Sequence, residues 1–147
     1  MIRCRALVIS LLLTFAIGTA AVAIPAAAAP PPPTAGQVAA GWLARQMTDR
    51  SHFTVTFSGV TYPNQGGTID AIFAFAATGS ANDYGTRAIT WLERPGVLSN
   101  YIGDGTTNSY AGATAKVALA AEVRGLNPDN FAKVDLLARL ENRSPGP

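Results

Sequence analysis

Few residues in this chain could do chemistry, and the most suggestive are Ser51 and His52, which are adjacent. A catalytic serine needs a base and an orienting acid brought together in space, and the sequence contains no Gly-x-Ser-x-Gly elbow. His52 is the sole histidine, which excludes a metal site built on several imidazoles. We therefore expect His52 to be a loop or surface residue rather than a general base.

A second candidate is the loop at residues 103–110, where Asp104, Thr106 and Asn108 occupy alternate positions. Their oxygens could face a calcium ion. The helix-loop-helix calcium pattern, however, needs more carboxylates and a terminal glutamate. An Asp-Gly turn is the simpler interpretation, and we expect no metal or cofactor.

Aromatic residues are the remaining candidates, since they could line an apolar ligand pocket. Aromatic side chains at helical spacing are more often core residues, and that is the alternative here. The pocket-lining candidates are Trp42, Tyr62, Trp91, Tyr101 and Tyr110.

The N-terminal segment has the order of a secretory signal peptide. Arg3 and Arg5 precede an apolar run and then small residues that end at Ala23. We predict that residues 1–23 are a cleaved signal, with cleavage as far as residue 29 as one alternative. The other is an uncleaved anchor, because the apolar run is long enough to span a bilayer. A secreted protein, outside the cell or at its envelope, is expected.

The rest of the chain is electrically neutral. The sequence has 11 Lys and Arg residues against 9 Asp and Glu, and Arg3 and Arg5 account for the difference. Without a basic cluster, neither nucleic acid nor a membrane surface is expected as a partner after signal cleavage. The only cysteine, Cys4, also lies in the predicted signal, so no disulfide is expected.

The mature chain reads as one small helical domain at residues 35–142, between an Ala/Pro-rich linker at 24–34 and a disordered tail at 143–147. Thr34 and Gln37 form a capping box at its first helix, and Gly79 is expected to end its second. The fold class is therefore predicted as all-α, with a short extended segment at 53–57. The five predicted helices cover about residues 35–47, 68–78, 83–94, 110–124 and 131–140.

These helices alternate between two kinds, which indicates an internal repeat. One kind has a Trp-Leu or Arg-Leu centre, and these centres recur at nearly equal intervals, at Leu43, Leu92 and Leu140. The other kind is alanine-rich and ends in glycine, at Gly79 and Gly125. A recurring pair of helices is typical of a repeated helical hairpin. Five helices make two and a half such hairpins.

The repeat bears on Asp70, the one carboxylate in the apolar run of the second helix. If the alanine-rich helices are equivalent, Thr68 corresponds to Thr114 and Asp70 to Lys116. A position that accepts either sign of charge favours a structural role over a catalytic one. Asp70 also falls in the first turn of the predicted helix, where a carboxylate interacts well with the helix dipole.

A two-helix repeat with Trp-Leu helices and short Ala/Gly helices resembles the α/α-toroid proteins of the prenyltransferase and squalene cyclase repeat family. Residues 38–141 look like secreted actinobacterial-type proteins that carry such repeats without the catalytic motifs. The resemblance implies an incomplete α/α toroid, because five helices cannot close the ring. An open repeat leaves apolar surface uncovered, so self-association through the open edge is expected.

The motifs of the family's enzymes are not complete in this chain. Gln37, Gly41 and Trp42 give Gln-x-x-x-Gly-Trp, one residue short of the cyclase motif. The acidic Asp-x-Asp-Asp motif is absent, with Asp70 standing alone. The zinc ligands of the protein prenyltransferases cannot come from a mature chain with one histidine and no cysteine.

We therefore expect a secreted helical repeat module that is non-enzymatic and binds an unidentified ligand or envelope component. One alternative is a fragment of a terpene-cyclase-like or prenyltransferase-like enzyme that contributes half of a cavity. The absence of clustered carboxylates counts against it. The other alternative is a truncated product without independent function.

Overall fold

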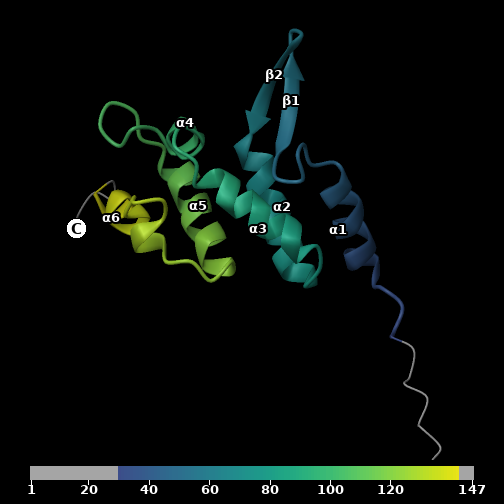
Figure 1. Cartoon of the computed structure of the whole chain (residues 1–147). Coiled ribbons are helices and arrows are strands. Elements are labelled where there is room, and N and C mark those ends of the chain that lie inside the picture. The colour runs from purple at the N-terminus through teal and green to yellow at the C-terminus, as the bar shows by residue number, and fades with distance from the viewer. Residues whose placement is uncertain (1–29, 143–147) are drawn as a thin grey trace, which may run out of the picture. The chain divides into compact units, whose positions relative to one another are not determined.

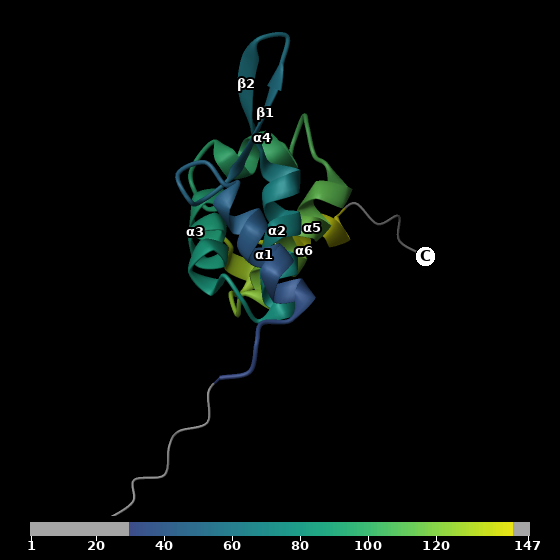
Figure 2. The same ribbon diagram turned by 90° about the vertical axis from the view of Figure 1, so that its right-hand side faces the viewer.

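The computed structural model describes residues 30–142 (Figures 1 and 2). The predicted signal peptide, the first part of the predicted linker and the predicted tail lie outside the described residues. The elements are α1 (Ala35–Arg45), β1 (Phe53–Phe57), β2 (Val60–Asn64), α2 (Gln65–Thr78), α3 (Asn82–Leu92), α4 (Val97–Ile102), α5 (Ala111–Val123), a 3-10 turn η1 (Pro128–Asn130) and α6 (Leu136–Glu141).

The prediction of an all-α fold, built as two and a half hairpins of an incomplete α/α toroid, is wrong. The described residues form six α-helices and a two-stranded antiparallel sheet, which makes the fold mixed α/β. β1 matches the predicted extended segment at 53–57, but its partner β2 was not predicted. Pro63 makes β2 hard to predict from the sequence. Proline has no N–H to donate to a strand ladder and usually indicates a loop or an edge strand.

The two strands form a hairpin closed by a two-residue turn. Phe57 pairs with Val60 across the turn. Ser58 and Gly59 both have positive φ, 49° and 79°. Two such residues in sequence define the turn type whose twist matches that of the flanking strands. In both views the hairpin projects beyond the helices (Figures 1 and 2).

The ends of two helices follow their predicted caps. At α1 the capping box of Thr34 and Gln37 is confirmed, with both of its hydrogen bonds present. At the end of α2, Gly79 takes the left-handed conformation expected of a C-terminal cap. The start of α2 was predicted too late. The Asn64 side chain accepts a hydrogen bond from the Gly67 N–H and starts the helix at Gln65.

The core is organised around α2, which contacts α1, α3 and α5. Figure 1 shows α2 between α1 on one side and α5 on the other. Ile69, Ile72 and Phe75 of α2 are fully buried. Because α1 packs mainly against α2, it lies at the edge of the helical array.

α2 and α5 also meet through matching residues. Thr68 and Thr114 are both buried, and each hydroxyl donates to the carbonyl four residues earlier. Asp70 and Lys116 form an ion pair with 2.7 Å between Oδ1 and Nζ. Asp70 therefore lies beyond the first turn of its helix and is paired across two helices, which corrects its expected place at the helix start. The internal repeat itself stays a prediction.

Candidate functional site

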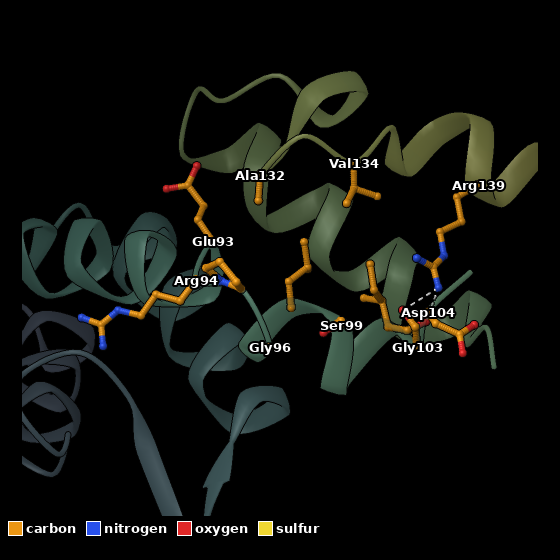
Figure 3. A pocket seen from close by; sticks show the side chains of 12 residues that line it. Glu93, Arg94, Gly96, Ser99, Gly103, Asp104, Ala132, Val134 and Arg139 are labelled. Atoms are coloured by element: carbon orange, nitrogen blue, oxygen red, sulfur yellow. Dashed lines mark hydrogen bonds between the residues drawn. The ribbon is translucent and has the colours of Figure 1, made fainter. Parts of the chain in front are cut away.

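The first candidate site is a hollow of about 300 Å³ beside α4 and the chain that leads into α6 (Figure 3). Leu98, Ile102 and Val134 supply its apolar lining. A site for a small ligand needs, in addition, a few polar groups that converge on the bound molecule. Whether this hollow can orient a ligand therefore depends on the charged residues at its rim.

These charged side chains do not converge on the hollow. Figure 3 shows Glu93 and Arg94 pointing away from its middle. Arg139 points toward the end of α4, where its Nη2 donates to the carbonyls of Ile102 and Gly103, each at 2.8 Å (Figure 3). This guanidinium fastens α6 to the end of α4. We interpret the hollow as the space beside that clamp rather than as a ligand site.

In the loop at residues 103–110, which was considered as a calcium site, the Asp104 carboxylate is hydrogen-bonded within the loop itself. Asp104 Oδ1 accepts hydrogen bonds from the N–H groups of Thr106 at 2.7 Å and Asn108 at 3.0 Å. The Thr106 hydroxyl donates to the same oxygen at 3.1 Å. These hydrogen bonds, with that from Asn108 the strongest influence, hold the pKa of Asp104 below its usual range. Within residues 30–142 no cluster of three or more His, Cys, Asp or Glu side chains could hold a metal.

Ser51 and His52 do form a hydrogen bond, with 2.9 Å between Ser51 Oγ and His52 Nδ1. The His52 ring stacks on Trp91, with the ring centroids 4.5 Å apart and an interplanar angle of 6°. Burial lowers the pKa of His52, and nearby Asp49 partly opposes that effect. His52 is therefore neutral at pH 7 and could accept a proton.

The environment of Ser51 argues against nucleophilic catalysis. Its side chain is buried, with 8% of the residue exposed. It lies in a tight turn in which Thr48 and His52 form a bridge and both Asp49 and Arg50 have positive φ. A nucleophile must reach its substrate, and this hydroxyl is mostly buried and hydrogen-bonded within its own turn, to the Thr48 carbonyl at 3.4 Å and to His52. The pair instead fixes the α1–β1 connection against Trp91 of α3.

The five aromatic candidates do not share one pocket. Trp91 is in the core, with 4% exposed, whereas Trp42 is 58% exposed on the outer side of α1. Tyr62 is half exposed on β2, and Tyr110 is half exposed just before α5. Tyr101 is partly buried on α4. None of the five lines the hollow of Figure 3, and Trp42 and Tyr110 line two separate hollows.

The second candidate site is the hairpin, which carries an apolar surface that the sequence revealed only in part. Val55 lies opposite Tyr62, and Phe57 lies opposite Val60. Directly opposed residues share one face of a sheet, so these four side chains form a continuous apolar face. All four are exposed, and Phe57 most of all, at 73%.

The hairpin face could have been found from the sequence by its turn. The Ser-Gly pair at 58–59 is a turn signal, and its place between two segments rich in β-branched and aromatic residues favours a hairpin. The segment from Ser51 to Ile69 also contains no Asp, Glu, Lys or Arg. Soluble proteins usually protect strand edges with charged residues, so an uncharged exposed hairpin is unusual.

The two edges of the hairpin differ in what they offer a partner. A two-residue turn makes Phe57 and Val60 a hydrogen-bonded pair, and pair types alternate along an antiparallel ladder. The backbone groups of Thr54 and Thr56 on β1 therefore point outward, as do those of Thr61 and Pro63 on β2. Since proline has no N–H, the outer edge of β1 has the more complete set of donors and acceptors.

Comparisons with known proteins identify no family. No family model, no curated protein and no solved structure matches the chain. The resemblance to the toroid repeat family thus stays a prediction. In the part of the chain that the structure describes, no helix is long and apolar enough to cross a membrane.

Proposed function

We propose that the chain is an exported binding module that recognises an extended polypeptide segment by adding it as a third strand beside β1. The observation that carries this proposal is the uncharged hairpin, which projects from the helical body with its apolar face exposed (Figure 1). Export rests on the predicted signal at residues 1–23. A partner at the envelope or outside the cell follows from that prediction.

Strand addition combines two kinds of recognition, and the hairpin offers both. Main-chain hydrogen bonds give affinity, and side chains on one face of the added strand give selectivity. The outward backbone groups of Thr54 and Thr56 supply the first. The apolar face beside them, with Val55 and Phe57 on the same strand, favours a segment with apolar residues at alternate positions.

The hairpin is also held firmly enough at its base to act as a template. The Thr68 hydroxyl of α2 accepts from the Phe53 N–H at 2.9 Å and donates to the Asn64 carbonyl at 2.7 Å. It thereby joins the first residue of β1 to the last residue of β2. A two-stranded hairpin alone is marginally stable in water, and this anchor on a buried helix compensates for that.

A pair of matched variants tests the proposal. Thr56 and Thr61 lie directly opposite each other, and their hydroxyls are 3.0 Å apart. Thr56→Pro removes an outward N–H from β1, whereas Thr61→Pro removes one from β2. Both variants lose the same hydroxyl contact and gain the same ring, so they differ only in the edge they alter.

The measurement is selection of peptides from a random displayed library on the purified chain, followed by titration of the selected peptides against the three proteins. We expect peptides with alternating apolar residues that bind at least about tenfold more weakly to Thr56→Pro, a loss of about 1.4 kcal/mol. Thr61→Pro should bind them like the original chain. Failure to select any such peptide, or equal weakening by both variants, would overturn the proposal.

A further inference from the structure

A second exposed surface, on α1, goes beyond the proposed function because it does not involve the hairpin. Among the residues of α1 only Gln37 and Arg45 are polar. A helix that is apolar on nearly all sides is normally buried on nearly all sides. Here Ala40 and Ala44 are buried, but Val38 and Trp42 are exposed, at 57% and 58%. The outer side of α1 is thus exposed to solvent, although its residues are as apolar as those of a buried helix.

Next to Trp42 lies an apolar groove of about 360 Å³ between α1 and α2. Its lining contains no charged residue, and most of the residues are small. Gly36 faces Thr78 closely, and a Cβ built at Gly36 would lie 3.2 Å from Thr78 Cγ2. The groove is lined by Gly36, Ala39, Ala40, Trp42, Leu43, Ala74 and Thr78.

We propose that this surface binds a second copy of the chain, with Trp42 of each copy seated in the α1–α2 groove of the other. A two-fold interface uses the same patch on both partners and must therefore be self-complementary. This patch meets that requirement, since it holds a protruding indole and an apolar groove side by side. Any other partner would have to supply an equivalent large side chain, which the chain itself already carries.

The charges on α1 fit a two-fold pairing of antiparallel helices. Trp42, Val38 and the groove can be buried without removing a charged group from water, which is the costly step in forming many interfaces. Arg45 is the only charge on α1 and lies in its last turn. In an antiparallel pair the two Arg45 residues lie at opposite ends of the contact, so they do not repel each other.

The size of the contact indicates a reversible dimer. A buried aromatic side chain removes about 150–250 Å² from water, so two seated indoles supply a substantial central anchor. Val38, exposed on the same side of α1, adds to this area, and the small size of the patch places the contact at the lower end of the range for specific interfaces. A dissociation constant in the micromolar range is expected.

Sedimentation velocity of the purified full chain tests this inference over a range of concentrations. The original chain should shift from monomer to dimer, and Trp42→Ala should raise the dissociation constant at least about tenfold. Ala39→Gln, which fills the groove while leaving Trp42 in place, should have the same effect. Circular dichroism of both variants should match that of the original chain, because both positions are exposed.

Thr56→Pro is the control that separates the two proposals. It alters the hairpin edge alone, so it should leave the dimer intact while weakening peptide binding. A chain that stays monomeric at every concentration overturns the inference, and so does a dimer that persists in Trp42→Ala and Ala39→Gln. A dimer lost in Thr56→Pro but kept in Trp42→Ala would place self-association at the hairpin and also overturn it.

Discussion

Thr68 offers a test of how the hairpin is held, because one buried hydroxyl serves both strands. It accepts from the Phe53 N–H and donates to the Asn64 carbonyl, at 2.9 and 2.7 Å. Thr68→Val keeps the shape of the side chain and removes only the hydroxyl. No cavity forms, so the change in free energy of unfolding reports the loss of these hydrogen bonds.

The expected magnitude follows from comparison with Thr114, its counterpart on α5. A buried donor left without a partner costs about 1–3 kcal/mol, and the Phe53 N–H is part-buried, so we expect Thr68→Val to cost about 2 kcal/mol. The Thr114 hydroxyl donates only to the Tyr110 carbonyl, which also accepts the Thr114 N–H at 2.9 Å. Thr114→Val therefore leaves no group unpaired and should cost about 0.5–1 kcal/mol.

Thermal unfolding followed by circular dichroism distinguishes these values. At about 4 °C per kcal/mol for a domain of this size, Tm should fall by about 8 °C in Thr68→Val and by about 2–4 °C in Thr114→Val. Hydrogen exchange should be faster in β1 of the first variant only. Equal losses of Tm, with β1 exchange unchanged, would refute the conclusion that Thr68 anchors the hairpin.

Three further predictions concern the core, the histidine and a glycine. Trp91→Ala should lower the free energy of unfolding by about 3–5 kcal/mol because Trp91 is buried. Trp42→Ala should change that of the monomer by less than about 0.5 kcal/mol. Urea titration measures both, and similar losses would contradict the placement of the two residues. Burial lowers the pKa of His52, so the unfolded state takes up a proton first and stability should fall as the pH drops below about 6.5. Between about pH 7 and 5.5 the Tm of His52→Phe should fall less steeply than that of the original chain, and parallel slopes would contradict the predicted shift. Gly103→Ala should lower the free energy of unfolding by about 2 kcal/mol or more, because the new Cβ would overlap the Asn108 carbonyl. Gly96 has a similar φ but open space around it, so Gly96→Ala should lower it by only about 1 kcal/mol. Equal melting curves for the two variants would count against this packing.

Sequence signals predicted two helix ends, where local chemistry decides the structure, but they missed α4 and extended the last helix over the bridge between Phe131 and Val134. The capping box of Thr34 and Gln37 starts α1, and Gly79 ends α2, as expected. At the start of α2 two signals competed. Gly66 and Gly67 read as helix breakers, but the Asn64 cap draws both into the first turn. A side chain that caps from outside the apolar run outweighed the low helix propensity of glycine.

The candidate site was less predictable, because exposure depends on which elements cover each helix. Trp42 and Trp91 occupy similar Trp-Leu motifs, yet Trp91 stacks on His52 in the core and Trp42 faces outward. Nothing in the two motifs distinguishes them. The difference arises because α3 contacts α2 and α4, whereas α1 packs mainly against α2 at the edge of the array.

The uneven packing of elements around α2 also explains why both proposed binding surfaces lie in the N-terminal part of the domain. α2 is covered by α1, α3 and α5, so its large residues Ile69, Ile72 and Phe75 are fully buried and serve stability. α1 and the hairpin both precede α2 in the sequence and receive cover on one side only. Several of their exposed residues, including Trp42 and Phe57, are large and apolar like those of the core. Mutations at these two positions should therefore separate binding from folding, and those at Trp91 should not.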